Sequence, residues 1–150
     1  MNAKGRSTLD TNILFYASDN TVPHKRDRAQ LLIRAVAAQD SILTLQSLAE
    51  LFNAFGKRRV LSHTAAEEIV LTYREIFTVV SAAETDLADA ILAQQEHNLP
   101  FWDAMLWATA RRAGCSLFFT EDFQDGRTLG GVTFRNPFNL SQTQLDELLD

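Results

Sequence analysis

Short runs of apolar and β-branched residues along the chain predict a set of strands. The clearest runs lie at 41–45 and 116–120, and weaker runs of the same type lie at 78–80 and 131–134. Leu9 ends a further predicted strand, although the residues that precede it are polar. The strands are therefore spread over the whole chain, with long intervals between them.

In those intervals, apolar residues recur at the spacing of a helix that buries one face. Two intervals open with Ser or Thr followed three residues later by Glu, which is the pattern of a capping box. Another begins at a proline and stops before Gly114, and these residues favour a helix start and a helix end. Helices are predicted over 27–38, 47–55, 64–77, 85–95 and 100–113.

Strands that alternate with helices predict an α/β domain with a mainly parallel sheet that helices cover on both faces. Ligands of such domains gather at the carboxyl ends of the strands. Asp10 directly follows the first predicted strand, and Asp122 follows the run that ends at Thr120. Glu50 lies one helical turn after the strand at 41–45. With Asp103, in the first turn of a predicted helix, these acids are expected around one edge of the sheet.

Each of these acids also has a structural explanation when it is taken alone. Asp10 would cap a short helix, and Glu50 would complete the capping box that Ser47 opens. Asp103 would favour a helix N-terminus, and Asp122 would be an ordinary turn residue. Taken together, however, four converging carboxylates repel one another unless divalent cations neutralise them. Mg²⁺ and Mn²⁺ prefer such oxygen ligands, and they suit the hydrolysis of phosphodiesters.

Composition narrows the class of protein. The chain has 150 residues, of which 46% are hydrophobic and 22% charged, as expected for one globular domain over 1–150. A net charge of −5 argues against a protein that passively coats nucleic acid. Cys115 is the only cysteine, so no intrachain disulfide is expected, and the thiol is expected to be buried and inert. No secretory signal is recognised in residues 1–7, and no apolar run suits a membrane helix, so we expect a cytoplasmic protein with no membrane partner.

Four segments of the chain resemble the sequence blocks of the PIN domain family, and within it the VapC-type toxins of bacterial toxin–antitoxin pairs. All four occur in the family's order and at its intervals, and they span most of the chain. They are Leu9-Asp-Thr-Asn-Ile-Leu14, Ser47-Leu-Ala-Glu-Leu-Phe52, Phe101-Trp-Asp-Ala-Met105 and Phe119-Thr-Glu-Asp-Phe-Gln-Asp-Gly126.

The resemblance implies a three-layer α/β/α sandwich and a ribonuclease that depends on Mg²⁺ or Mn²⁺. It also implies a homodimer and inhibition by a cognate antitoxin protein that binds DNA. In this chain Glu121 is expected to face solvent instead of joining the acids. The family's catalytic and metal-binding acids correspond to Asp10, Glu50, Asp103 and Asp122, with Asn12 and Thr120 as supporting residues and Asp125 as an outer carboxylate.

Basic residues at two helix ends offer a path for RNA phosphates. An equally weighted interpretation is that they are solvated charges, which at a helix C-terminus also favour the helix dipole. Phe101 and Trp102 stand beside Asp103 and are interpreted as core residues in preference to base-stacking platforms. The candidate RNA-binding residues are Lys25, Arg26 and Arg28 in one cluster and Lys57, Arg58 and Arg59 in the other.

Three other functions are alternatives to the toxin nuclease. An aspartyl phosphatase also places an Asp after its first strand, but it requires a second Asp where Asn12 stands. A non-catalytic PIN-like binding module and an RNA-processing nuclease outside a toxin pair stay as alternatives. The presence of all four acids favours an enzyme. The segment 141–150 is predicted to form a short amphipathic helix, packed on the domain or on a partner.

Overall fold

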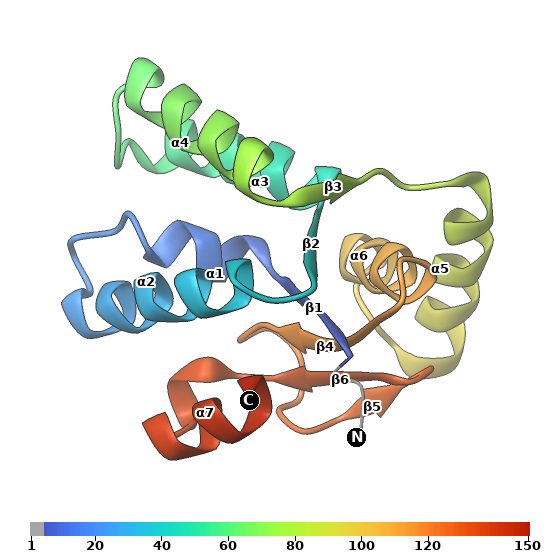
Figure 1. Cartoon of the computed structure of the whole chain (residues 1–150). Helices are drawn as coiled ribbons and strands as arrows, with labels where there is room; N and C mark the ends of the chain where they lie inside the picture. Colours follow the sequence, from blue (N-terminus) through green and yellow to red (C-terminus); the bar gives the residue numbers. More distant parts are fainter. Residues whose placement is uncertain (1–4) are drawn as a thin grey trace.

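The sheet at the centre of the molecule is mixed but mainly parallel. A computed structural model describes residues 5–150, so residues 1–4 of the N-terminal segment lie outside the described residues. The strand order is β3-β2-β1-β4-β6-β5, and every neighbouring pair is parallel except β5 and β6 (Figure 1). The strands are β1 Arg6–Leu9, β2 Ser41–Thr44, β3 Thr78–Val80, β4 Cys115–Phe119, β5 Thr128–Leu129 and β6 Val132–Arg135.

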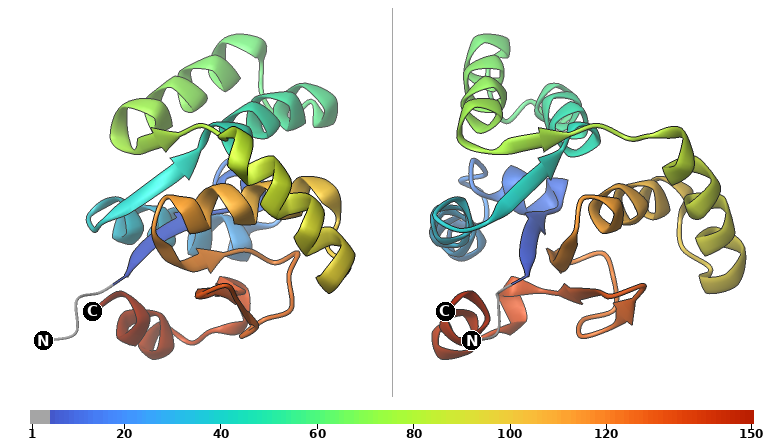
Figure 2. Two further views of the ribbon diagram at one scale, coloured as in Figure 1. Left: turned by 90° about the vertical axis from the view of Figure 1, so that its right-hand side faces the viewer. Right: turned by 45° about the vertical axis from the view of Figure 1, so that its right-hand side comes forward.

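Helices cover both faces of this sheet, which confirms the predicted α/β class with three layers (Figure 2). One apolar core lies between the sheet and α1, α2, α3, α4 and α7. A second core lies on the opposite face, under α5 and α6. The helices are α1 Thr11–Tyr16, α2 Pro23–Ala37, α3 Leu45–Arg58, α4 His63–Ile76, α5 Glu84–His97, α6 Phe101–Arg112 and α7 Gln142–Leu149, with a 3₁₀ turn at Pro137–Asn139.

The polar strand β1 lies between β2 and β4, and is therefore buried on both faces. Ser7 and Thr8 are both buried, and the Thr8 hydroxyl donates a hydrogen bond to the carbonyl oxygen of Ile42 at 2.8 Å. A buried hydroxyl with a partner avoids most of the cost of desolvation. This long-range contact explains how a polar segment forms a central strand.

Both predicted capping boxes are wrong, because each helix begins earlier than its box suggested. Thr44 caps α3, and its hydroxyl oxygen accepts from the backbone N–H of Ser47. Ser62 caps α4 in the same way, by accepting from Ala65. At the C-terminal end of α6, Gly114 has a φ of 87°, the left-handed conformation predicted for a helix end there.

The C-terminal helix α7 packs on the domain. Ser141 caps it, and Leu145 and Leu149 are buried in the core that α1, α2 and α3 share. Cys115 is buried as expected, and burial raises the pKa of its thiol to about 12. No helix within residues 5–150 combines the length and the apolar character that crossing a membrane requires.

Candidate active site

The four predicted acids line one pocket at the carboxyl edge of the sheet. Asp10 directly follows β1 and Asp122 follows β4, and these two strands are parallel neighbours. The helix α3 brings Glu50 to the same place, and the N-terminal turn of α6 brings Asp103. The pocket has a volume of about 370 Å³ and is lined by Asp10, Thr11, Asn12, Phe15, Tyr16, Glu50, Ala54, Arg58, Asp103, Glu121 and Asp122.

Asp10 is the most deeply buried of these acids. One carboxylate oxygen accepts from the backbone N–H of Thr11 at 2.7 Å, and the other accepts from the hydroxyl of Thr120 at 2.7 Å. Burial is the largest influence on this carboxyl and raises its pKa to about 7, and the nearby charges of Asp122 and Asp103 add to the rise. Both hydrogen bonds act in the opposite direction, but they do not offset the burial.

Asp103 and Asp122 also hold their protons more tightly than free carboxyls. Burial raises the pKa of Asp103 to about 6, with further contributions from the charges of Asp122 and Glu50. The pKa of Asp122 is raised as well, mainly by desolvation and then by the charges of Glu121 and Glu50. Carboxylates that raise one another's pKa form a site that a cation would stabilise.

Neutral side chains orient Glu50. Its two carboxylate oxygens accept separately, one from the Thr11 hydroxyl at 2.9 Å and the other from the Gln46 amide at 2.8 Å. Because Thr44 is the cap of α3, Glu50 is free of the capping function that was its structural explanation. Its carboxylate instead faces the pocket with the other acids.

The pocket offers hard oxygen donors, which suit Mg²⁺ or Mn²⁺. Asn12 adds an amide whose oxygen and nitrogen are both buried and form no hydrogen bond with any described residue, although the amide lies near enough to Asp122 to lower the pKa of that carboxyl. Across residues 5–150, no three His, Cys, Asp or Glu side chains are close enough together to enclose an ion directly. Mg²⁺ generally keeps several waters and few protein ligands, so a spread donor set of this kind fits it.

Glu121 does not face solvent as expected. It accepts hydrogen bonds from the Tyr16 hydroxyl and from the Lys25 ammonium, which lies 2.8 Å from the carboxylate. Lys25 also lies over the rings of Tyr16 and Phe138. This cluster ties the loop that carries Asp122 to α1 and α2, so it forms one wall of the pocket.

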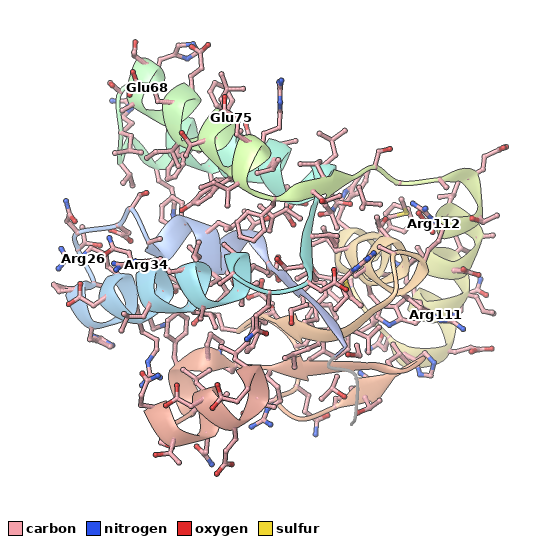
Figure 3. All side chains as sticks on the ribbon, in the orientation of Figure 1. Arg26, Arg34, Glu68, Glu75, Arg111 and Arg112 are labelled. Atoms are coloured by element: carbon pink, nitrogen blue, oxygen red, sulfur yellow. The ribbon has the colours of Figure 1, made fainter. Side chains whose placement is uncertain are left out.

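The predicted basic residues are not equivalent in the structure. Arg58 lines the pocket, whereas the other members of its cluster, Lys57 and Arg59, are not among the pocket residues. In the other cluster Lys25 is paired with Glu121, and Arg26 pairs with Asp27 at the outer end of α2 (Figure 3). One guanidinium nitrogen of the third member, Arg28, is buried and has no hydrogen-bond partner among the described residues.

Two further sequence expectations change. Asp125 does not line the pocket, because its carboxylate accepts from the guanidinium of Arg135 at 3.1 Å and from the backbone N–H of Asn136. The interpretation of Trp102 as a core residue is wrong, since the residue is 63% exposed. Phe101 is partly buried against the core under α5 and α6, as expected.

Sequence reasoning missed the polar residues that hold the acids, namely Thr11, Gln46 and Tyr16. Thr11 contacts Glu50 from α1, and a linear pattern carries little trace of such a long-range contact. Gln46 lies four residues before Glu50 on α3, so its contact could have been found from the helical spacing. The position of Arg58 could have been found, because Glu50 and Arg58 are eight residues apart and share one helix face.

A parallel α/β sheet with a carboxylate-rich pocket at its carboxyl edge defines an acidic-site α/β domain. The chain belongs to the PIN domain family, whose sequence profile matches residues 8–124. That match includes all four predicted acids. Comparison with curated protein sequences finds no match.

Solved structures share the fold at low sequence identity. A toxin–antitoxin complex from Klebsiella pneumoniae is 18% identical, with a TM-score of 0.64, over 89% of this chain and 99% of that one. VapC20 of Mycobacterium tuberculosis, a toxin that cleaves the sarcin–ricin loop, is 17% identical with a TM-score of 0.64, over 83% and 97%. VapBC2 of Rickettsia felis, bound to a promoter DNA fragment, is 14% identical with a TM-score of 0.63, over 87% and 98%.

Proposed function

We propose that this protein is a ribonuclease that hydrolyses phosphodiester bonds of RNA with Mg²⁺ or Mn²⁺. The observation that carries the proposal is the convergence of Asp10, Glu50, Asp103 and Asp122 on one pocket, with burial and mutual repulsion raising the pKa of three of them. Bound divalent cations would relieve that repulsion. They would also activate water and stabilise the charge that develops on the phosphodiester.

The chain's own residues prepare the pocket for such an ion. Thr120 and the backbone of Thr11 fix both oxygens of Asp10, so that carboxylate loses little freedom when it binds a cation. Thr11 also holds Glu50 through its hydroxyl. Asp103 and Asp122 complete the acidic wall, and Asn12 directs an amide toward it without competing hydrogen bonds.

We further propose that the nuclease is the toxin of a toxin–antitoxin pair, with a cognate antitoxin as its inhibitor. Membership of the PIN family and the shared fold with structures of toxin–antitoxin complexes support this assignment. A cytoplasmic homodimer belongs to the same proposal. The exposed side chains of Leu87, Ile91 and Leu92 on α5 provide apolar surface for contact between two copies.

The deciding experiment is the cleavage of total cellular RNA by purified protein, with Mn²⁺ or Mg²⁺ compared with EDTA. We expect cleavage with metal only, and we expect Asp10→Asn to lower the rate by at least about 100-fold, because even the loss of an outer partner of a metal ligand costs 10- to 100-fold. Asp89→Asn is the matched control, since Asp89 is exposed on α5 and does not line the pocket. Wild-type cleavage by Asp10→Asn would show that the proposed site is wrong.

Expression in bacterial cells separates the toxin from an RNA-processing nuclease. The toxin assignment predicts growth arrest by the wild-type chain but not by Asp10→Asn. Metal-dependent cleavage in vitro without growth arrest would favour the processing nuclease. A well-folded protein that cleaves no RNA in either assay would favour the binding module.

A further inference from the structure

The pocket contains a positive charge as well as its acids. Among the pocket-lining residues within 5–150, Arg58 is the only basic one. It lies at the C-terminal end of α3, the helix that also carries Glu50. A guanidinium in a pocket that otherwise gathers carboxylates needs an explanation from its position and its partners.

The helical spacing of α3 places Arg58 on the same face as Glu50. Glu50, Ala54 and Arg58 are spaced by four residues, so they lie on one helix face, and all three line the pocket. Long helical side chains lean back over the preceding turn, which here is the turn of Ala54. The small alanine side chain leaves this part of the pocket open between Glu50 and Arg58.

An aromatic ring packs against the guanidinium of Arg58. The central carbon of the Arg58 guanidinium lies 4.6 Å from the centre of the Phe15 ring. Phe15 follows Thr11 by four residues of α1, about 6 Å along the helix, and the Thr11 hydroxyl donates to Glu50. The guanidinium is therefore held against Phe15 in the same pocket, and it forms no ion pair with the pocket acids.

The charge of Arg58 is not neutralised within the described residues. Lys25, the other cation near the pocket, lies 2.8 Å from the carboxylate of Glu121. No carboxylate lies within ion-pair distance of Arg58 among residues 5–150. The charge of Arg58 contributes to the lowered pKa of the Asp19 carboxyl, behind the hydrogen bonds from Thr21 that are the main cause.

We propose that Arg58 binds a phosphate of the RNA backbone next to the phosphate that is cleaved, and so sets the direction in which the strand crosses the pocket. This inference rests on the proposed ribonuclease function. The planar guanidinium presents several N–H donors that match the oxygens of a phosphate. Its offset from the acids separates the two phosphates, with cleavage at the carboxylates and anchoring at Arg58.

The test measures binding in a background that does not cleave. The parent is the full chain with Asp10→Asn, and the probe is a short, mixed-sequence, single-stranded RNA carrying a fluorophore, at constant Mn²⁺ and varied KCl. Adding Arg58→Gln should weaken binding about tenfold, as expected for the loss of a hydrogen-bonded charge contact. It should also reduce the slope of log K against log salt by about 0.7, which is the value for one phosphate contact on a single strand.

Two further variants control for charge and for folding. Arg74→Gln makes the same change of charge at an exposed position of α4 outside the pocket, and it should leave both affinity and slope at the parent values. Arg58→Lys keeps the charge but loses the planar fork. It should keep the salt slope while binding more weakly than the parent, and it decides the question if Arg58→Gln does not fold.

Equal affinity and equal slope for the parent and Arg58→Gln would overturn the assignment and leave Arg58 with a packing role on Phe15. Absence of RNA binding by the parent at low salt would overturn it as well. Failure of the wild-type protein to cleave RNA would count against the nuclease but would not alter this binding result. The two proposals therefore fail separately.

Discussion

Asp10 and Asp86 are both buried aspartates near the N-terminus of a helix, but they are satisfied in opposite ways. Asp86 in α5 is fully buried, and both of its oxygens lie 3.0 Å from Nε of Arg112 in α6. It also accepts from the backbone N–H of Ala83. Asp10 accepts only from neutral donors, and its charged neighbours are other acids.

The difference separates a structural carboxylate from the one that we propose to bind metal. The Asp86 pair is complete, because the protein itself supplies the cation that compensates for burial. Arg112 lies beside α5, on the other side of the sheet from the α2 arginines in Figure 3. Asp10 is buried at comparable cost without such a partner, and a bound divalent cation would supply the missing positive charge.

The largest effect that tests this contrast is the dependence of stability on pH in metal-free protein. The folded-state pKa of Asp10, about 7, lies above the value of 3.8 for a free carboxyl. Folding therefore favours the protonated form, so this contribution to stability is present below about pH 4 and is lost as the pH rises to about 7. Relative to Asp10→Asn, the wild type should lose up to roughly 4 kcal/mol of unfolding free energy over this range.

Urea denaturation in EDTA at about pH 4 and about pH 8 measures this loss. The comparison with Asp10→Asn cancels the titration of the surface carboxylates, which both proteins share. Added Mn²⁺ at about pH 8 should restore the wild type and have a much smaller effect on the variant. A constant difference between the two proteins at both pH values would mean that Asp10 is not strained by its burial.

The next largest effect concerns the completed pair. Arg112→Ala leaves the carboxylate of Asp86 buried without its cation, and we expect a loss of about 2 kcal/mol of unfolding free energy. The Arg112 side chain is 38% exposed, so water reaches the site and the loss is smaller than for a fully buried pair. Chemical denaturation measures it, and RNA cleavage by the folded variant should be unchanged.

Arg111→Ala is the neighbouring control. Arg111 lies over the Trp107 ring at 5.5 Å and forms no ion pair among residues 5–150, so its removal should cost only about 0.5 to 1 kcal/mol. If both variants lost the same stability, the pairing of Asp86 with Arg112 would contribute little. Asp86 would then no longer be an example of a buried carboxylate that an ion pair stabilises, in contrast to Asp10.

Much of this fold could be predicted from local patterns, because strands and helices alternate and their apolar positions are regular. The exceptions depend on contacts between distant segments. The residues that precede Leu9 are polar, yet they form the central strand β1, since the hydroxyl of Thr8 finds an acceptor in β2. The start of α3 was misplaced because Thr44 and Ser47 both suit a cap, and only the backbone conformation shows which of them serves.

The positions of the acids follow from topology, since parallel strands bring their carboxyl ends to one edge. The direction in which a side chain points does not follow from the topology. The two basic clusters could not be distinguished in the sequence. In the structure, the helical spacing of α3 directs Arg58 alone of its cluster into the pocket. Glu121 and Trp102 were assigned to the wrong environments, because one turn of a loop or helix decides whether a side chain reaches a neighbour or solvent.

Apart from the Arg111 control, the smallest expected effect on stability comes from Thr120, which links two of the acids. Its hydroxyl donates to Asp10 and accepts from the backbone N–H of Asp122 at 3.0 Å. Thr120→Val keeps the shape but leaves these two groups unsatisfied, so we expect a loss of about 1 kcal/mol. Because the Thr120 bond lowers the pKa of Asp10, its removal should raise that pKa further and move the metal-free pH transition upward.

Cleavage should respond more strongly than stability to this change. Loss of an outer partner of a metal ligand typically costs 10- to 100-fold in activity or metal affinity, so Thr120→Val should lie in this range at limiting Mn²⁺. Thr120→Ser retains the hydroxyl and should stay near the wild-type rate, which separates the hydrogen bond from the methyl group. Wild-type cleavage by Thr120→Val would mean that Asp10 needs no orientation by its neutral partners. In that case its burial alone would distinguish it from an ordinary helix cap.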